Sequence, residues 1–208
     1  MSGCEALLNK ALELKKKGLS VREIADELNL QVDTVDWLLL HEKERARAPP
    51  PMDYAVNWSA IGCSTRRLSQ IGWAMADIVR ESRANNEFED FDVVVGIELS
   101  GLPLGLMVAD DLEKPFAAAR AAKPTGTAEG SRYLTGTISM NFSSVEGKRV
   151  LLVTDVISTG IILRDVIRSL KELQATPVAM VAFVDKRGGG DIEGVPVKAL
   201  VSLIPFKR

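Results

Sequence analysis

A cluster of small polar residues follows a strongly apolar segment in the last third of the chain. Residues 149–153 are mostly apolar and β-branched, which predicts a buried strand. Thr154 and Asp155 come next, and the Ser-Thr-Gly run at 158–160 opens a predicted amphipathic helix. Because a helix N-terminus carries unpaired N–H groups and partial positive charge, such a turn can bind a phosphate. Asp155 would then accept hydrogen bonds from the hydroxyls of a sugar.

The same pattern has a simpler interpretation. In an ordinary strand-to-helix turn, Ser158 or Thr159 would only cap the helix. We favour phosphate binding by Ser158, Thr159 and Gly160, because a strand, an acid and a loop follow one another in that order.

A second glycine-rich stretch follows another predicted strand, residues 92–96, which is apolar on both faces as in a parallel sheet. Gly96, Gly101 and Gly105 lie at its end and just beyond it. Glycines allow the backbone to approach a ligand closely, so Ser100 and Gly101 are predicted to belong to a second anion-binding loop.

Two basic residues, Arg120 and Lys123, lie in a segment rich in Gly, Thr and Pro after the strand predicted at 115–119. A segment of this kind can cover a ligand site. The alternative is a plain hairpin that leads to residues 133–140, and the sequence supports both interpretations equally.

The composition is that of an ordinary globular protein, with 208 residues of which 46% are hydrophobic and 26% charged. That length allows one α/β domain and a small additional domain. No apolar run is long enough to cross a membrane, and no signal-peptide pattern opens the chain. We therefore expect a cytoplasmic protein without a membrane partner.

The residue counts argue against a metal centre and against general attraction to nucleic acid. Cys4 and Cys63 fall in different segments with no CxxC spacing, and His41 is the only histidine, so we expect no bound metal. The net charge of −2 gives no overall attraction to DNA. Any DNA contact must therefore come from a local basic face.

Residues 5–47 have the pattern of consecutive helices. Gly18 suits the left-handed end of a first helix, and Ser20 with Glu23 forms a capping box for a second. Asn29 is expected to end that second helix, since asparagine tolerates the left-handed conformation. Apolar residues at helical spacing predict a small core.

The tight turn between two of these helices matches the helix-turn-helix pattern over residues 21–40. The residues predicted to contact DNA bases or phosphates are Arg22, Gln31, Asp33, Thr34 and Lys43. Aspartates repel the DNA backbone, and only the amino group of cytosine gives them a direct role in base reading. The alternative is a three-helix module for oligomerisation or for binding a partner; we favour DNA binding.

These patterns divide the chain into a helical DNA-binding domain (1–47), a proline-rich linker (48–52) and an α/β domain (53–208). In the last of these, predicted strands alternate with predicted helices. That order predicts a parallel sheet with ligand-binding loops at the carboxyl ends of its strands.

The strand, acid and Ser-Thr-Gly loop within 149–160 resemble the ribose-phosphate signature of type I phosphoribosyltransferases. Residues 101–105, 119–130 and 185–190 are similar to segments of orotate phosphoribosyltransferases, so the resemblance covers roughly residues 53–203. It implies a type I phosphoribosyltransferase-like α/β fold, a parallel sheet flanked by helices, preceded by a small all-α helix-turn-helix domain. It also implies phosphoribosyl pyrophosphate (PRPP) as a ligand, and Mg²⁺ would accompany PRPP if PRPP binds.

The sequence departs from those enzymes at positions linked to catalysis. Thr154 replaces the first of two acids, Ser100 replaces a lysine, and the 119–130 segment lacks the histidine of the enzymes. A charged hydrogen bond is typically worth about 1.5–3 kcal/mol, so these losses would lower turnover by orders of magnitude and weaken binding less. We assign no catalytic residue; Asp155 and Lys123 would have that role if the chain were active.

A DNA-binding module before a transferase-like domain with weakened catalytic equipment resembles the archaeal orotate phosphoribosyltransferase-like transcriptional regulators of sugar catabolism. That resemblance implies a homodimer that binds DNA under the control of a phosphorylated sugar or nucleotide such as PRPP. The alternative is an active orotate phosphoribosyltransferase, which converts orotate and PRPP to orotidine monophosphate and pyrophosphate.

Overall fold

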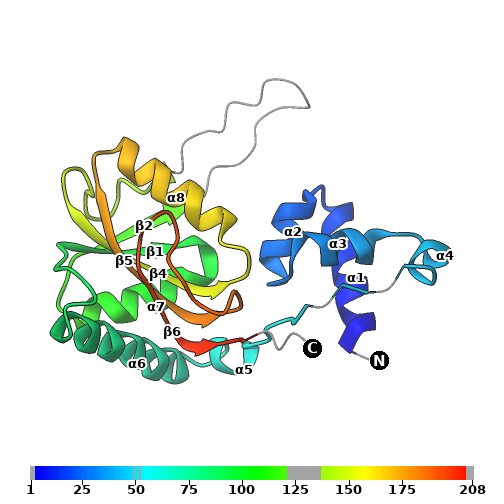
Figure 1. Cartoon of the computed structure of the whole chain (residues 1–208), viewed down its shortest axis with the longest axis horizontal. Helices are drawn as coiled ribbons and strands as arrows, with labels where there is room; N and C mark the ends of the chain where they lie inside the picture. The colour runs from blue at the N-terminus through cyan, green and yellow to red at the C-terminus, as the bar shows by residue number, and fades with distance from the viewer. Residues whose placement is uncertain (1–2, 49, 52, 121–136, 205–208) are drawn as a thin grey trace. The chain divides into compact units, whose positions relative to one another are not determined.

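The computed structural model describes residues 3–48, 50–51, 53–120 and 137–204 (Figure 1). The chain divides into two units, Met1–Trp58 and Ser59–Arg208. Each unit has its own hydrophobic core, so each is described by itself.

The first unit is built from short helices around a small core. The helices are α1 (Gly3–Lys16), α2 (Val21–Glu27), α3 (Val32–Leu39) and α4 (Glu42–Arg45). Ala11 of α1, Ile24 of α2 and Val35 of α3 are fully buried where the apolar faces of the three helices meet. This arrangement confirms the predicted small helical domain.

Local signals in the sequence determine where α1 and α2 end and begin. Gly18 follows α1 with φ +88°, and Asn29 follows α2 with φ +53°, both in the left-handed region as predicted. The Glu23 carboxylate accepts the backbone N–H of Ser20 at 2.8 Å, and the Ser20 hydroxyl accepts the N–H of Glu23 at 3.3 Å. These two bonds confirm the predicted capping box.

Residues after α4 also belong to the first unit, so the boundary between the units differs from the predicted one. The second domain was expected to start at residue 53, whereas the second unit starts at Ser59. The reason is that residues after α4 form hydrogen bonds with α3 and with its N-cap residue. The Asp53 carboxylate accepts the backbone N–H of Gln31 at 2.6 Å, and the Trp37 indole N–H donates to the carbonyl of Ala48 at 3.0 Å.

The second unit alternates strands and helices, as predicted. Its elements are α5 (Ser59–Gly62), α6 (Thr65–Ala84), β1 (Val93–Ile97), α7 (Glu98–Asp111), β2 (Phe116–Arg120), β3 (Thr137–Ile138), β4 (Arg149–Ile157), α8 (Ile161–Glu172), β5 (Thr176–Asp185) and β6 (Val197–Ser202). The strands form one sheet in the order β3-β2-β1-β4-β5-β6. Strand β3 runs antiparallel to β2, and the other neighbouring strands are parallel.

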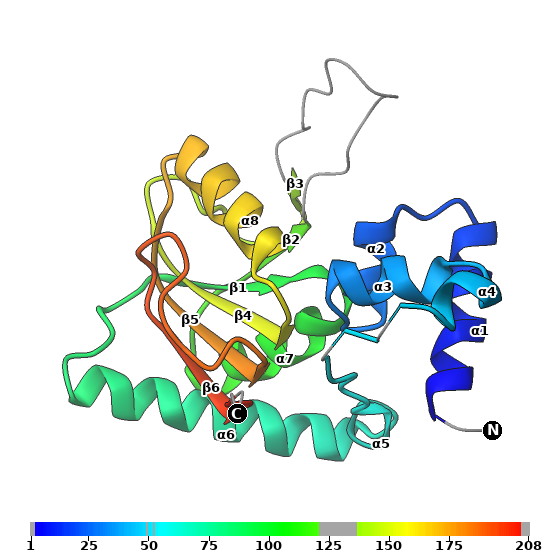
Figure 2. The same ribbon diagram turned by 45° about the vertical axis from the view of Figure 1, so that its right-hand side comes forward.

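Helices cover both faces of this sheet. Figures 1 and 2 show α6 and α7 on one face and α8 on the other. Side chains alternate along a strand, so Val93 and Val95 of β1 pack on the α8 side with Leu163 and Ile167. The result is the parallel sheet flanked by helices that the sequence predicts, and it brings the carboxyl ends of β1, β2, β4 and β5 to one edge.

An ion-pair network around Asp90 lies at the opposite edge of the sheet, where β1 and β4 begin. The Asp90 carboxylate lies 2.6 Å from Arg83 at the end of α6, 3.9 Å from Lys114 before β2 and 3.8 Å from Arg149 in β4. The hydrogen bond from the Phe91 backbone lowers the pKa of Asp90, and the three cations lower it further against a partial opposing effect of burial.

This network predicts a stability that depends on pH. Because the folded-state pKa of Asp90 lies below its ordinary value of 3.8, the carboxylate stabilises the fold above that value, and this contribution disappears as the pH falls through the folded-state pKa. We expect Asp90→Asn to lower the free energy of unfolding by about 0.5 kcal/mol near neutral pH, the size typical of exposed ion pairs, and to have no effect in strong acid. Urea denaturation at both pH values tests this, with Glu89→Gln as the matched control. An equal loss at both pH values would contradict the role of the Asp90 charge.

Candidate functional site

Strand β4 carries the first candidate residues, but it is longer than predicted. It was expected to end at Val153, with Thr154 and Asp155 in a loop, and it continues to Ile157 because pairing with β5 extends as far as Asp185. Thr154 and Asp155 are consequently strand residues, 5% and 9% exposed. The acid is therefore held by the central part of the sheet and not by a loop.

The Ser-Thr-Gly run forms the turn between β4 and α8. Gly160 is buried and has φ +76°, and the helix begins at Ile161, directly after the predicted Ser-Thr-Gly loop. A left-handed glycine is needed here because the chain must reverse over a short distance. The Thr159 hydroxyl accepts the N–H of Ile161 at 3.3 Å, which matches the local capping role considered for this residue.

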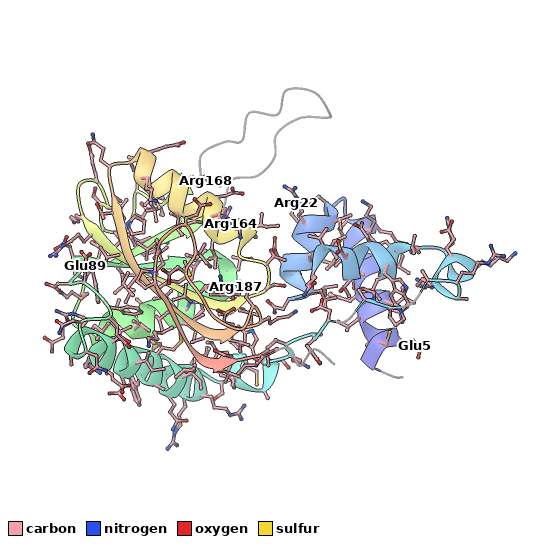
Figure 3. The ribbon with its side chains drawn as sticks, in the orientation of Figure 1. Glu5, Arg22, Glu89, Arg164, Arg168 and Arg187 are labelled. Atoms are coloured by element: carbon pink, nitrogen blue, oxygen red, sulfur yellow. The ribbon has the colours of Figure 1, made fainter. Side chains whose placement is uncertain are left out.

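A second turn, within the segment 185–190, supports this one through an ion pair that was not predicted from the sequence. The guanidinium of Arg187 donates to both carboxylate oxygens of Asp185, at 3.1 and 2.8 Å, and to the carbonyl of Gly190 at 2.9 Å. Asp185 is almost fully buried at the end of β5. A side chain added at Gly160 would lie 3.8 Å from the Arg187 side chain and 3.3 Å from Ile192, so the two turns are packed together. Figure 3 shows Arg187 at this end of the sheet.

Ser100 and Gly101 were predicted to lie in a loop, and this prediction is wrong. They lie in the first turn of α7, which starts directly after β1. A Cβ at Gly101 would be 3.0 Å from the Cα of Thr154, and one at Gly105 would be 2.7 Å from the Cα of Gly96. These glycines therefore allow a helix to approach the sheet, whereas the prediction gave them the role of approaching a ligand. The same contact brings Ser100 and Gly101 beside Thr154.

Arg120 ends β2 at the same edge of the sheet and is exposed. The registers of β2 and β4 against Gly96 of β1 put Arg120 level with Asp155, two strand spacings or about 10 Å away. Ala119 and Arg120 pair with Ile138 and Thr137 of the antiparallel strand β3. Lys123 lies outside the described residues.

The residues predicted to contact DNA lie in the first unit. Arg22, Gln31, Asp33 and Lys43 are exposed, and Figure 3 labels Arg22 on α2. Thr34 differs, because its hydroxyl oxygen is buried and has no hydrogen-bond partner among the described residues. Thr34 is half-buried as a residue, and its hydroxyl oxygen, which was predicted to face a DNA groove, is turned toward the protein.

The described ranges show neither a membrane span nor a metal cluster. No helix in them is both long and apolar enough to cross a bilayer, and no three His, Cys, Asp or Glu side chains are grouped so that they could hold a metal ion.

Comparison with known proteins identifies the class to which this fold and site belong. The family described as phosphoribosyl transferase domain matches residues 57–203. Orotate phosphoribosyltransferase from Aeropyrum pernix superposes with a TM-score of 0.53 at 21% identity, over 76% of this chain and 83% of that one. Adenine phosphoribosyltransferase from Thermoanaerobacter pseudethanolicus superposes with a TM-score of 0.54 at 14% identity, over 74% of this chain and 90% of that one. These two similarities show the fold alone, since an orotate enzyme and an adenine enzyme match equally well.

A relative that matches the whole chain is more specific. The transcriptional regulator GfcR of Methanosarcina mazei is 43% identical over 204 residues, which are 98% of each chain. This chain belongs to the phosphoribosyltransferase family, in the group that contains such archaeal transcriptional regulators.

The buried pair of Asp185 and Arg187 yields a first prediction for the site. Removing one member of a buried ion pair leaves the other charge unpaired, so we expect Arg187→Met to lower the free energy of unfolding by about 3 kcal/mol. The double variant Asp185→Asn with Arg187→Met should recover part of this loss. Urea denaturation of the two variants and of the unmodified chain measures these free energies. A loss below about 1 kcal/mol for Arg187→Met would contradict the view that this ion pair supports the turn at Gly160.

The buried hydroxyl of Thr34 yields a second prediction. Because an unpartnered buried hydroxyl is costly, we expect Thr34→Val, which keeps the shape, to raise the free energy of unfolding by roughly 1 kcal/mol and to leave DNA affinity unchanged. Thr34→Ser keeps the hydroxyl and serves as the control. Loss of DNA binding in Thr34→Val, measured by fluorescence anisotropy, would restore Thr34 as a DNA contact.

Proposed function

We propose that the phosphoribosyltransferase-like domain of this transcriptional regulator binds a phosphorylated sugar or nucleotide, such as PRPP, and thereby controls the binding of DNA by the first unit. The observation that carries the proposal is the contact of α7 with β4 at Gly101 and Thr154. Through it, two predicted anion-binding segments from distant parts of the sequence meet at one edge of the sheet.

The proposed ligand fits the groups that meet at this edge. Helices α7 and α8 both begin here, and the N–H groups of a first helical turn are natural donors to phosphate oxygens. Arg120 adds a cation at the same edge. Asp155, held by the strand, is positioned to accept hydrogen bonds from ribose hydroxyls, and Ser158 contributes a hydroxyl group beside the phosphates.

Mg²⁺ fits this site only together with the ligand. The described residues offer Asp155 but no group of three metal-binding side chains, and Mg²⁺ usually binds through one or two carboxylates and the phosphates of a substrate. In this proposal Asp155 would hold the ion through its carboxylate, and the diphosphate would supply the other oxygens.

A sensing role fits the residues better than catalysis does. Thr154 and Ser100 stand where the resembling enzymes have an acid and a lysine, and both side chains are neutral here. The whole-chain relative is named a transcriptional regulator, and its name gives no transferase activity. The enzyme alternative, conversion of orotate and PRPP, therefore has weaker support.

The first unit is proposed to contact DNA as a helix-turn-helix. Residues 28–31 connect α2 to α3, and α3 would lie in the major groove with Gln31 and Asp33 toward the bases. Arg22 and Lys43 would contact phosphates. We further propose a homodimer with operator half-sites about 34 Å or a multiple of it apart, and a cytoplasmic location, where its DNA partner lies.

Calorimetric titration of the full chain with PRPP and Mg²⁺, and with ribose 5-phosphate, tests the proposed ligand class. We expect Asp155→Asn to weaken PRPP binding by about tenfold, the effect of losing one charged hydrogen bond. Asp110→Asn, an exposed carboxylate at the other end of α7, is the matched control and should bind as the unmodified chain does.

Two outcomes would contradict this proposal. One is that neither compound binds to the unmodified chain. The other is robust conversion of orotate and PRPP that disappears in Asp155→Asn, which would make the chain an enzyme.

A further inference from the structure

The two helices of the proposed helix-turn-helix are capped in different ways. In α2 the third helical residue, Glu23, accepts the N–H of the N-cap Ser20. In α3 the third helical residue is Thr34, whose hydroxyl oxygen has no partner among the described residues. The N-cap of α3, Gln31, forms no side-chain capping bond in the described part of the chain either.

Asp53, which lies outside α3, accepts the N–H of the N-cap residue Gln31, the bond that no side chain of α3 provides. One of its carboxylate oxygens accepts the N–H of Gln31 at 2.6 Å, and the other accepts the N–H of Tyr54 at 2.7 Å. The carboxylate therefore does for α3 what Glu23 does for α2. It comes from 22 residues further along the chain, just before the second unit begins.

Two further bonds join nearby residues to α3, and we call the described residues of this stretch (45–48, 50–51 and 53) the linker strap. The guanidinium of Arg45 donates to the carbonyl of Leu38 at 2.7 Å, and the indole of Trp37 donates to Ala48 at 3.0 Å. The linker strap thus contacts α3 near its C-terminal end, through Arg45 and Ala48, and at its N-terminal end, through Asp53. The sequence of the strap includes Pro50 and Pro51, and proline-rich segments are stiff.

We propose that Asp53 is a positioning residue for α3, through which the segment leading to the effector-binding domain controls how α3 presents Gln31 and Asp33 to DNA. This inference rests on the proposed function of α3 as the base-reading helix. The N-terminal residues of such a helix contact base edges. A displacement of the strap withdraws the carboxylate, frays the first turn of α3 and weakens specific binding.

The test uses the full chain, double-stranded DNA selected by that chain from a random library, and PRPP with Mg²⁺ as the effector probe. Asp53→Ala removes the hydrogen-bond acceptor, whereas Asp53→Asn keeps an acceptor and removes only the charge. We expect Asp53→Ala to bind the selected DNA roughly 3- to 30-fold more weakly, the effect of losing a helix cap, and Asp53→Asn to restore most of the affinity.

If Asp53 acted only through its charge, Asp53→Ala would bind DNA more tightly and not more weakly. The direction of the change in DNA affinity therefore separates the two explanations. Removing an acid from a DNA-binding unit strengthens DNA binding, and Glu27→Ala, at an exposed position on α2, measures the size of that effect. We also expect the backbone N–H of Gln31 to exchange faster with solvent in Asp53→Ala but not in Glu27→Ala. The change in DNA affinity caused by PRPP should become smaller in Asp53→Ala, while its affinity for PRPP is unchanged.

The outcomes separate this inference from the proposed function. If Asp53→Ala and Asp53→Asn bind DNA alike, or if Asp53→Ala behaves as Glu27→Ala does, Asp53 acts only through its charge and the inference is overturned. If Gln31→Ala and Asp33→Ala leave the selected DNA sequence unchanged, α3 is not the base-reading helix, and the proposed function of the first unit fails together with the inference.

Discussion

The contact between α7 and β4 is the constraint on which the candidate site depends. At Gly101 a helix lies so close to the central strand that a Cβ would come within 3.0 Å of the Cα of Thr154 and 3.1 Å of the carbonyl of Val153. Both are backbone atoms, which cannot move aside as the end of a flexible side chain can. A side chain at position 101 would therefore force the helix or the strand to shift, and glycine lets the first turn of α7 lie beside Asp155 without that shift.

The other half of the site depends on burial and on ion pairing. Thr154 and Asp155 are buried in a strand that is paired with β1 as far as Val153 and with β5 as far as Ile157, and this holds the acid in place. The turn at Gly160, which follows this strand, packs against Arg187 and Ile192, and Arg187 is itself held by its ion pair with Asp185. The anion-binding edge proposed here would be equally useful for transferring a phosphoribosyl group and for sensing one. The difference lies in the charged groups around the ligand, and here several of those groups are neutral.

In the first unit, the proposed DNA-reading helix is held by residues that precede the second unit in the chain. Helix α3 has two exposed acids and no lysine or arginine, so the DNA binding proposed for it would depend on orientation more than on attraction to phosphates. Three hydrogen bonds attach the linker strap to this helix. Orientation is the property that such a strap can change, because it contacts both ends of α3 and continues into the second unit.

Periodicity, caps and residue order in the sequence alone determined the parallel α/β class, the small helical domain and the capping box of Ser20 and Glu23, since these features depend on neighbouring residues. The tertiary structure decided where β4 ends, because pairing with β5 continues through Thr154 and Asp155. It also decided that the glycine-rich stretch at Gly101 is a helix packed on a strand, that the hydroxyl oxygen of Thr34 is buried, and that Asp53 caps α3. Each of these depends on residues far apart in the chain, whose contacts no local pattern contains.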